Sequence, residues 1–411
     1  MLKKTRIAFI DDHAVVNFPG GIERVVCNFC NAFAEKGYEM ALVCMNPEKG
    51  RPFFPLLPTV TFVNLWYAFD THAFGGWRWQ MKKIEKELLR TFAGKDMRVG
   101  GRCIRDPKQA YYQETFIQRL HRFIEAWHPD LLISIGAASS YLGKCATKDT
   151  AIPMIGMGHE DPENPPVRYS EEEQEGLRHC DVFQVLLDCY AEHYRKMGCK
   201  QVVTIPNAVP QVPDERIADL SVGHHRIVHI GRIDGSLKRQ HLLIEAFAQI
   251  AEKYPEWSLH FYGSIDNRRY KKRLDALICK HQLEGRVIFE GTSDRIAVEL
   301  RKADIFAFPS AAESFGLALA EAMSAGLPVL AYRSCRGASS LVEHGGSGLL
   351  VEEGAASLAQ GLEQLIKDPA LRIRLGRAGH EAMKSYAPER VWIQWEQLLK
   401  DVLSSEQVER I

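Results

Sequence analysis

The chain has 411 residues, of which 52 are basic and 52 acidic, so its formal net charge is zero. That length exceeds one compact core and suits two domains of about 200 residues each. A neutral chain has no overall field that would attract nucleic acid or an acidic polymer. Its ten cysteines, with one C-x-x-C at Cys27 and Cys30, show no disulfide or zinc spacing, which favours buried thiols. No apolar run approaches the roughly 20 residues that span a bilayer.

The first apolar run, Ile7–Ile10, follows a basic start and is ended by Asp11-Asp12-His13. This run is too short for the apolar segment of a signal peptide. It predicts a first buried β-strand followed by a loop, in which we expect no chemical role for Asp11 and Asp12. We therefore expect a cytoplasmic protein.

Short apolar runs alternate along the chain with longer segments of helical period, such as His241–Tyr254. Strands that are apolar throughout and separated by helices are typical of parallel sheets covered on both faces. The sequence predicts an α/β protein with two doubly wound parallel sheets. The predicted strands are Ile7–Ile10, Met40–Cys44, Val60–Val63, Leu131–Ile135, Met154–Met157, Val182–Leu187, Val202–Ile205, Ile227–Ile230, Leu259–Tyr262, Val287–Phe289, Ile305–Pro309, Val329–Ala331 and Gly348–Val351.

Two segments interrupt this alternation. Residues 66–127 are long, basic and aromatic, with glycine pairs at 75–76 and 100–101, and we interpret them as an insertion of helices and loops on the first domain. Residues 206–213 contain three prolines and form the predicted linker. We therefore divide the chain into residues 1–208 and 209–387.

The most informative segment is Pro309–Met323, in which a short loop joins a strand to a helix predicted to run from about Ser314 to Ser324. Glu313 would precede the helix, and Glu321 would lie about two turns inside it, roughly 10–12 Å away along the axis. The amides of Ser314, Phe315, Gly316 and Leu317 would be free to donate to phosphate or sugar oxygens.

A second informative segment, Gly231–Arg239, is cationic and follows the strand Ile227–Ile230. It lies at the strand end where open parallel sheets bind ligands. Arg232 and Lys238 supply the positive charge that a departing diphosphate requires. No D-x-D triplet is present to hold a divalent cation, so we expect these two cations to replace a metal.

These motifs resemble the retaining family-4 (group 1) GT-B glycosyltransferases. Glu313-Ser314-Phe315-Gly316 with Glu321 is similar to the E-x-F-G…E signature, and Gly231-Arg232 with Lys238 to the diphosphate clamp. Further matches are the glycine loop at Gly20-Gly21, the H-D motif at His159 and the I-P-N-G-V segment around Asn207, where Ala208 replaces glycine. The interval from Arg232 to Lys238 is one residue longer than in many members, so the loop must bulge around Gly235, with Arg239 as the alternative cation.

The resemblance implies two facing Rossmann-like domains and roles for the matched residues. Glu321 would bind the ribose, Glu313 the donor sugar, and Arg232 with Lys238 the diphosphate. His159 would contact the donor sugar from the first domain, and Gly20 with Gly21 would close over the phosphates. Asn207, Ser314, Phe315, Gly316 and Leu317 complete the expected donor site. The resemblance also implies that a C-terminal helix, about residues 388–411, packs back on the first domain.

The expected activity is a retaining, metal-independent, hexosyltransferase-type transfer in cell-surface polysaccharide, lipopolysaccharide or other glycoconjugate assembly. The donor would be a nucleotide sugar, preferably UDP-linked, which is a co-substrate and not a cofactor. Two alternatives stay open: a nucleotide-sugar epimerase, which forms product without an acceptor, and a non-catalytic nucleotide-sugar-binding subunit. A glycosidase is disfavoured, because its carboxyl pair flanks one bond and needs no phosphate clamp.

The acceptor would be a glycan or a lipid-linked glycan. Between residues 76 and 127, basic side chains outnumber acidic ones about two to one and are mixed with aromatic ones. One interpretation is a solvated helical hairpin with core aromatics. The other is a peripheral face for anionic phospholipid on the inner side of the cell membrane. The basic residues are Arg78, Lys82, Lys83, Lys86, Arg90, Lys95, Arg98, Arg102, Arg105, Lys108, Arg119 and Arg122.

Overall fold

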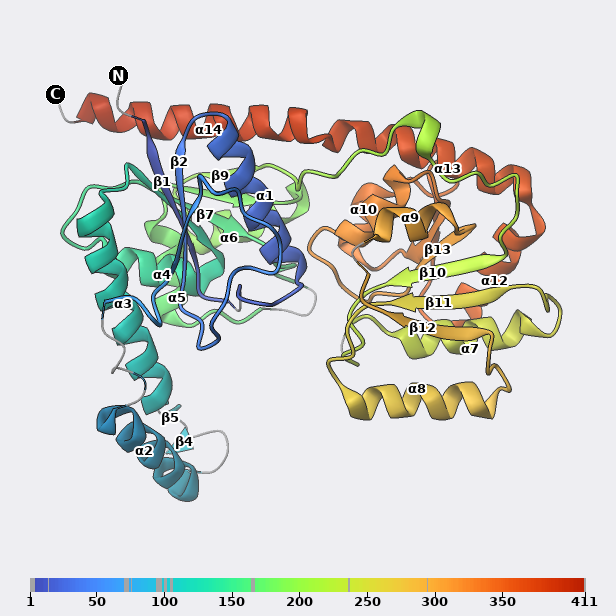
Figure 1. Ribbon diagram of the computed structural model, residues 1–411, viewed down its shortest axis with the longest axis horizontal. Helices are drawn as coiled ribbons and strands as arrows, with labels where there is room; N and C mark the ends of the chain where they lie inside the picture. The colour runs from blue at the N-terminus through green and yellow to red at the C-terminus, as the bar shows by residue number, and fades with distance from the viewer. Residues whose placement is uncertain are drawn as a thin grey trace. The chain divides into compact units, whose positions relative to one another are not determined.

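The computed structural model describes residues 4–13, 15–69, 74, 76–93, 98–99, 102–103, 106–163, 167–235, 237–293 and 295–409. The chain forms two compact units (Figure 1). Unit 1 comprises residues 1–159, 168–204 and 396–411, and unit 2 comprises residues 160–167 and 205–395. Residues 160–167, which the sequence placed with the first domain, therefore cluster with unit 2.

Unit 1 is built on a seven-stranded parallel sheet in the order β3-β2-β1-β6-β7-β8-β9. The strands are β1 (Arg6–Asp11), β2 (Glu39–Cys44), β3 (Thr61–Asn64), β6 (Leu131–Ile135), β7 (Met154–Gly158), β8 (Val182–Val185) and β9 (Val202–Thr204). The helices are α1 (Gly21–Glu35), α2 (Trp77–Ala93), α3 (Pro107–Trp127), α4 (Gly136–Ala146), α5 (Glu171–His179) and α6 (Asp188–Met197). A separate antiparallel pair joins β4 (Arg98–Val99) to β5 (Arg102–Cys103).

Unit 2 has a six-stranded parallel sheet in the order β12-β11-β10-β13-β14-β15. The strands are β10 (Arg226–Ile230), β11 (Ser258–Tyr262), β12 (Val287–Gly291), β13 (Ile305–Phe308), β14 (Val329–Tyr332) and β15 (Leu349–Val351). The helices are α7 (Gln240–Ala251), α8 (Arg268–Lys280), α9 (Ile296–Arg301), α10 (Leu317–Ser324), α11 (Arg336–Leu341), α12 (Ala355–Lys367) and α13 (Pro369–Met383), with short 3-10 turns η1 (Asp214–Arg216) and η2 (Lys384–Tyr386).

The last helix, α14 (Pro388–Glu409), has residues in both units, because the part from Glu396 onward clusters with unit 1. Lys36 Nζ, at the end of α1, lies 2.9 Å from Glu396 Oε2. Among the described helices, none is both long and apolar enough to cross a membrane.

Strand β1 shows why the sheet of unit 1 needs helices on both faces. Phe9 meets Phe29 of α1, with ring centroids 5.5 Å apart, whereas Ala8 and Ile10 join a core cluster that includes Phe116 of α3. Because successive side chains of a strand point to opposite faces, this pattern covers the sheet on both sides. The predicted strands are confirmed, with ends that shift by one or two residues.

The segment that the sequence assigned to an insertion has two different parts. It adds no strand to the seven-stranded sheet, but α3 belongs to the core, since Phe116, Leu120, Phe123 and Ile124 pack in the same cluster as β1. Helix α2 lies beside the start of α3 and away from the sheet (Figure 1). The insertion is therefore limited to α2 and the short β4-β5 pair.

Cys27 and Cys30 lie on the inner face of α1 and are buried. Burial raises the pKa of the Cys27 thiol to about 12, so it stays protonated at neutral pH. The prediction of buried, inert thiols is confirmed for this pair.

Candidate active site

In each sheet, successive strands are added first toward one edge and then, after a crossover, toward the other edge. The change of direction lies between β1 and β6 in unit 1 and between β10 and β13 in unit 2. In open parallel sheets, the loops that leave the carboxyl ends of such strands diverge and leave a crevice for ligands. Except for Asn207, which follows β9, the candidate site residues follow β1, β7, β10 or β13. Each unit is described by itself.

In unit 2 the loops after β10 and β13 meet through an ion pair between Lys238 and Glu313. Lys238 Nζ donates to Glu313 Oε1, and the two side chains are only 21% and 17% exposed. The backbone amide of Ala311 also donates to the carbonyl of Leu237, at 2.8 Å. Two residues that lie 75 positions apart in sequence, and that were predicted to share a donor site, are therefore in direct contact.

Arg232 lies on the same loop and is more open to solvent. Its guanidinium is 46% exposed and faces two carboxylates, Asp234 at 3.8 Å and Asp266 at 3.6 Å. Gln240, the first residue of α7, fixes the backbone by donating to the Arg232 carbonyl at 2.9 Å. The Arg232 side chain therefore lies beside two carboxylates and is partly open to solvent, so an anionic ligand can reach its charge.

The extra residue between Arg232 and Lys238 is accommodated at Gly235, whose φ of +83° lies in the left-handed region. A Cβ there would lie 2.8 Å from the Tyr270 ring, so both the turn and the space require glycine. Arg239, the alternative cation, points to a different partner and pairs with Glu353. The geometry therefore favours Lys238 over Arg239 as the partner of Glu313.

His229 of β10 lies beneath this loop and was missed in the sequence. Its Nδ1 bonds the Ala307 carbonyl at 3.0 Å, and its buried Nε2 has no hydrogen-bond partner. A Cβ on Gly231 would lie 3.0 Å from that Nε2. Burial lowers the pKa of His229 to about 4, opposed by its bond to Ala307, so the ring is neutral at pH 7. The only signal in the sequence was a histidine in an otherwise apolar strand.

The start of α10 corrects one prediction. The helix begins at Leu317 and not near Ser314, because Gly316 adopts a left-handed φ of +86° and caps the helix. Glu321 is therefore about one turn inside the helix, and the axial separation expected between it and Glu313 does not apply. The amides of Ser314, Phe315 and Gly316 belong to the loop that precedes the helix.

The remaining predicted donor residues surround this loop. Leu317, Ser314 and Glu321 are half-buried, whereas Phe315 is buried and its ring meets Tyr386 with centroids 5.6 Å apart. Gly337 of α11 packs so tightly on the loop that a Cβ there would lie 2.6 Å from the Glu313 carbonyl oxygen. Asn207, inside the predicted linker, is buried. The loop is thus fixed from two sides, by Tyr386 and by α11.

In unit 1, Gly20 caps α1 and Gly21 is its first residue. A Cβ on Gly20 would lie 1.9 Å from Glu23 Oε2, and Glu23 is buried. Glycine at this position is explained by the packing of Glu23 as well as by the predicted approach of phosphates.

His159 follows β7 directly and is buried, and its Nε2 has no hydrogen-bond partner. Burial lowers the pKa of His159 to about 4, the Asp11 carboxylate opposes this shift, and His13 adds to it. The predicted site histidine is thus neutral at pH 7. Its electrostatic partners come from the loop after β1, which the sequence had given no chemical role.

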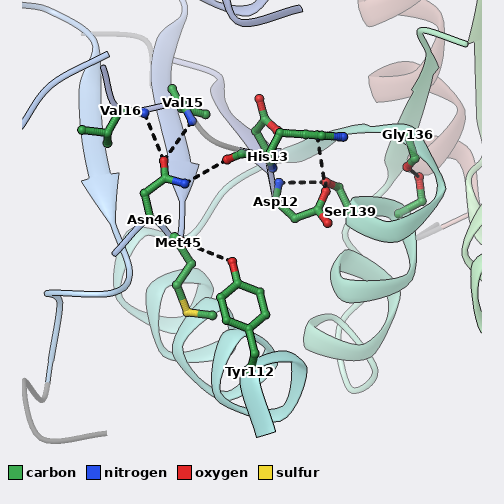
Figure 2. A network of polar contacts seen from close by, with 11 residues as sticks. Asp12, His13, Val15, Val16, Met45, Asn46, Tyr112, Gly136 and Ser139 are labelled. Carbon is green, nitrogen blue, oxygen red and sulfur yellow. Dashed lines mark hydrogen bonds and ion pairs between the residues drawn. The ribbon is translucent and has the colours of Figure 1, made fainter. Parts of the chain in front are cut away.

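That loop carries a polar network (Figure 2). His13 Nδ1 lies 3.0 Å from Asp11 Oδ1, and the hydrogen bond to Asp11 raises the pKa of His13 to about 9 despite partial burial. The Asp12 amide donates to Ser139 Oγ of α4 at 3.0 Å, and the Ser139 hydroxyl donates back to the Asp12 carboxylate. Asn46 holds the other side of the loop by accepting from the Val15 and Val16 amides and donating to the His13 carbonyl.

Asp11, Asp12 and His13 are also the one group among the described residues whose possible metal-ligand atoms lie together, within 4.8 Å of one another. His13 Nδ1 contacts Asp11 Oδ1, and this hydrogen bond raises the pKa of His13. The second Asp11 oxygen is buried without a hydrogen-bond partner. The group is therefore an ion-pair network with one unused acceptor.

The segment after His159 has its own partners in unit 2. Arg336, the first residue of α11, donates to Glu163 and lies 3.7 Å from Asp161 Oδ1. The next residue, Gly337, contacts the Glu313 loop as described above. The acidic part of the predicted H-D motif is thus bound to the helix that supports Glu313.

Two family models match the chain and between them span most of it. The model described as glycosyltransferase family 4 matches residues 19–211, and the model described as glycosyl transferases group 1 matches residues 215–382. The boundary between the two matches falls in the predicted linker.

Curated relatives agree with these models. An uncharacterized glycosyltransferase of Haemophilus influenzae is 24% identical over 92% of this chain and 96% of its own length. A lipopolysaccharide core biosynthesis glycosyltransferase of Rhizobium meliloti is 32% identical over 45% of this chain, and an N-acetyl-alpha-D-glucosaminyl L-malate synthase of Bacillus anthracis is 31% identical over 43%. The matches span only 50% and 45% of those two relatives.

Solved structures share the fold over nearly the whole chain. Sucrose-phosphate synthase from Thermosynechococcus elongatus has a TM-score of 0.76 at 21% identity, covering 98% of this chain and all of that one. Anabaena HepE, solved in complex with UDP and glucose, has a TM-score of 0.70 at 19% identity, covering 97% of this chain and all of that one. Given both sheets, both family models and these likenesses, the chain belongs to the group 1, family 4 glycosyltransferases of the GT-B fold.

Proposed function

We propose that this glycosyltransferase moves a hexose from a nucleoside diphosphate sugar, preferably a UDP-sugar, to a hydroxyl of a glycan acceptor, with retention at the anomeric carbon and without a metal ion. The observation that carries the proposal is the half-buried Lys238–Glu313 ion pair at the strand reversal of unit 2. The UDP and glucose bound to the similarly folded Anabaena HepE support a UDP-sugar donor.

The ion pair gives the donor site a defined resting state. Lys238 and Glu313 form an ion pair, and a diphosphate sugar offers an alternative partner to each. The diphosphate takes the Lys238 ammonium, and the sugar hydroxyls donate to the Glu313 carboxylate. One ligand with an anionic part and a hydroxyl-rich part is therefore needed to replace the internal pair completely.

The cations then act on the leaving group. As the bond between the anomeric carbon and the phosphate oxygen breaks, negative charge grows on the diphosphate, and Lys238 and Arg232 stabilise it. The same phosphate accepts the proton of the acceptor hydroxyl that attacks from the same face of the sugar. Glu321, on the half-exposed face of α10, binds the ribose hydroxyls and holds the nucleotide.

Neutral His159 donates to or accepts from a hydroxyl of the donor sugar and carries no charge during the reaction at pH 7. Glycan assembly is supported as the cellular role by similar proteins, which include a lipopolysaccharide core biosynthesis glycosyltransferase. The acceptor proposed here is accordingly a glycan or a lipid-linked glycan.

The test is a panel of UDP- and GDP-sugars incubated with the enzyme, read by thermal shift and by release of nucleoside diphosphate, with and without EDTA. We expect one UDP-sugar to raise the melting temperature and to be hydrolysed slowly in EDTA. The anomeric configuration of the transferred sugar is then read by NMR. A strict need for Mg²⁺ or Mn²⁺, an inverted product, or rearranged donor formed without any acceptor would each contradict the proposal.

A further inference from the structure

Helix α2 exposes an apolar stripe to solvent. Trp77, Met81, Ile84 and Leu88 are 73%, 52%, 53% and 55% exposed, and they are among the most exposed large hydrophobic side chains of the described residues. Their spacings of four, three and four residues place all of them on one side of the helix. Scattered exposed apolar residues are ordinary, but a continuous stripe on one helix face indicates a binding surface.

The opposite side of α2 holds the helix in place. Trp79 is buried between Phe74, at a centroid distance of 5.2 Å, and Tyr111 of α3, at 5.9 Å. Lys86 on the same side pairs with Asp106, the residue that caps α3. The stripe therefore points away from the rest of unit 1, and packing on α3 does not account for it.

The charge of α2 indicates what covers the stripe. Its sequence contains five basic residues, Arg78, Lys82, Lys83, Lys86 and Arg90, and only two acidic ones, Glu85 and Glu87. Two copies of such a helix would repel each other if their stripes met. An anionic lipid surface attracts the same helix, and long basic side chains reach the headgroups while the apolar face enters the acyl boundary.

The structure also corrects which residues of this segment are able to face lipid. Arg119 is buried and donates to the carbonyls of Leu65 and Trp66, and Tyr111, Phe116 and Phe123 pack in or against the core. Lys82 and Lys86 are in ion pairs. Lys95 and Arg105 lie outside the described residues, and so do the side chains of Arg90, Arg98 and Arg102. Arg78 and Lys83 are the exposed basic residues of α2 best placed for headgroups.

We propose that α2 is an interfacial helix that lays the face formed by Trp77, Met81, Ile84 and Leu88 into an anionic phospholipid bilayer, on the inner side of the cell membrane. A tryptophan at one end of the stripe suits the headgroup level, where amphipathic rings are enriched. The helix lies in the interface and does not cross it. Delivery of a lipid-linked acceptor at the same surface rests on the proposed glycosyl transfer, whereas binding to the bilayer does not.

The test is sedimentation of the full chain with vesicles of phosphatidylcholine, with and without phosphatidylglycerol, at low and high salt. The stripe variant carries Trp77→Gln, Met81→Gln, Ile84→Gln and Leu88→Gln. A matched control carries Val222→Gln, Ile265→Gln and Ile393→Gln, three large apolar residues exposed outside α2. A charge variant carries Arg78→Ser and Lys83→Ser.

We expect the wild type and the control to sediment with phosphatidylglycerol vesicles, the stripe variant to lose at least about tenfold in partitioning, and the charge variant to lose less. Slow donor hydrolysis in solution should be unchanged in the stripe variant, so a failure of the membrane proposal is distinguishable from a failure of the proposed activity. Wild-type protein that does not bind these vesicles, or a stripe variant that binds as wild type does, would overturn the proposal. So would a wild-type dimer that the stripe substitutions convert to monomer, since the stripe would then join two copies.

Discussion

The polar side chains at the points where the strand order reverses differ between the two units of this enzyme. In unit 2, Lys238 and Glu313 lie on loops after β10 and β13 and form an ion pair, and Arg232 on the first of these loops lies 3.8 Å from Asp234. In unit 1, the loop after β1 and the end of β7 hold buried polar atoms that have no partner, Asp11 Oδ2 and His159 Nε2. Both regions contain a buried histidine Nε2 without a hydrogen-bond partner, but unit 2 adds a half-buried ion pair between two loops, whereas unit 1 adds an unused carboxylate oxygen on Asp11.

This difference agrees with the proposed reaction, whose donor consists of a charged diphosphate and a neutral sugar. A diphosphate brings full charges, and exposed or half-buried ion pairs exchange partners at little cost because solvent screens them. A sugar brings neutral hydroxyls, which both donate and accept, so in the proposed reaction they suit the Glu313 carboxylate of unit 2 and the buried Nε2 of His159 in unit 1. Substitutions at the residues of both regions test this difference.

The largest effect is expected for Glu313→Gln. The substitution keeps the shape of the side chain but removes the charge that orients the sugar hydroxyls and pairs with Lys238, so turnover should fall about 100-fold or more at saturating donor. Steady-state release of nucleoside diphosphate measures it. Glu363→Gln is the matched control, because Glu363 pairs with Lys253 on the surface of the same unit. Equal turnover in both variants would remove Glu313 from the site.

Lys238→Ala and Arg232→Ala should lower turnover about tenfold to a hundredfold, and should weaken donor binding less, because the charge on the leaving diphosphate is greatest late in the reaction. Arg239→Ala is the control. Arg239 neighbours Lys238 but pairs with Glu353, and we expect its loss to change turnover less than about threefold. If Arg239→Ala lowered turnover more than Lys238→Ala, then Arg239 and not Lys238 would be the cation that binds the diphosphate.

The buried histidines predict an acid-sensitive stability. His159 and His229 have pKa values near 4 in the fold and an ordinary value of 6.5 when unfolded, so the unfolded chain binds more protons between these values. The contribution of these two histidines to stability should be constant above pH 6.5 and fall as the pH drops toward 4. At about pH 5 each histidine would cost about 2 kcal/mol of unfolding free energy. Denaturant unfolding at several pH values measures this slope, which should flatten in His159→Asn with His229→Asn. An unchanged slope in that double variant would show that the rings are not buried and neutral.

The smallest effect concerns His13 and has the opposite sign. Its bond to Asp11 raises its pKa to about 9 in the fold, so its contribution is complete below 6.5 and is lost as the pH rises through about 9. The side chain is 47% exposed, and solvent screening keeps the effect small. At neutral pH the free energy of unfolding of a His13→Gln variant should be slightly lower than that of the wild type. The two values should converge as the pH rises through about 9. A difference that grows with pH would contradict the ion pair.

Most of the fold was predictable because parallel strands buried on both faces must be apolar throughout, as Ile7–Ile10 and Leu131–Ile135 are. The family resemblance assigned Lys238 and Glu313 to one donor site, and the direct contact between them is seen only in the structure. The start of α10 was wrong by three residues, because the left-handed φ of Gly316 is a backbone property that helical periodicity does not reveal.

The polar edge of unit 1 was less predictable for a physical reason. Asp12 meets Ser139 and Asp11 acts on His159 only after β1, β6 and β7 are aligned in the sheet, and no short motif joins these residues. The stripe on α2 was hidden among core aromatics such as Trp79, which the sequence does not distinguish from an exposed residue such as Trp77.

The central claim is that the two glutamates of unit 2 divide the donor, with Glu313 on the sugar and Glu321 on the nucleoside. Calorimetric titration with UDP alone tests it most directly, because UDP has the ribose and the diphosphate but no sugar. We expect Glu321→Gln to weaken UDP binding about tenfold or more, since it loses hydrogen bonds that a carboxylate accepts from the ribose. Glu313→Gln should bind UDP as well as the wild type or better, because Lys238 is released from its internal partner. Wild-type affinity in Glu321→Gln, or an equal loss in both variants, would contradict the account.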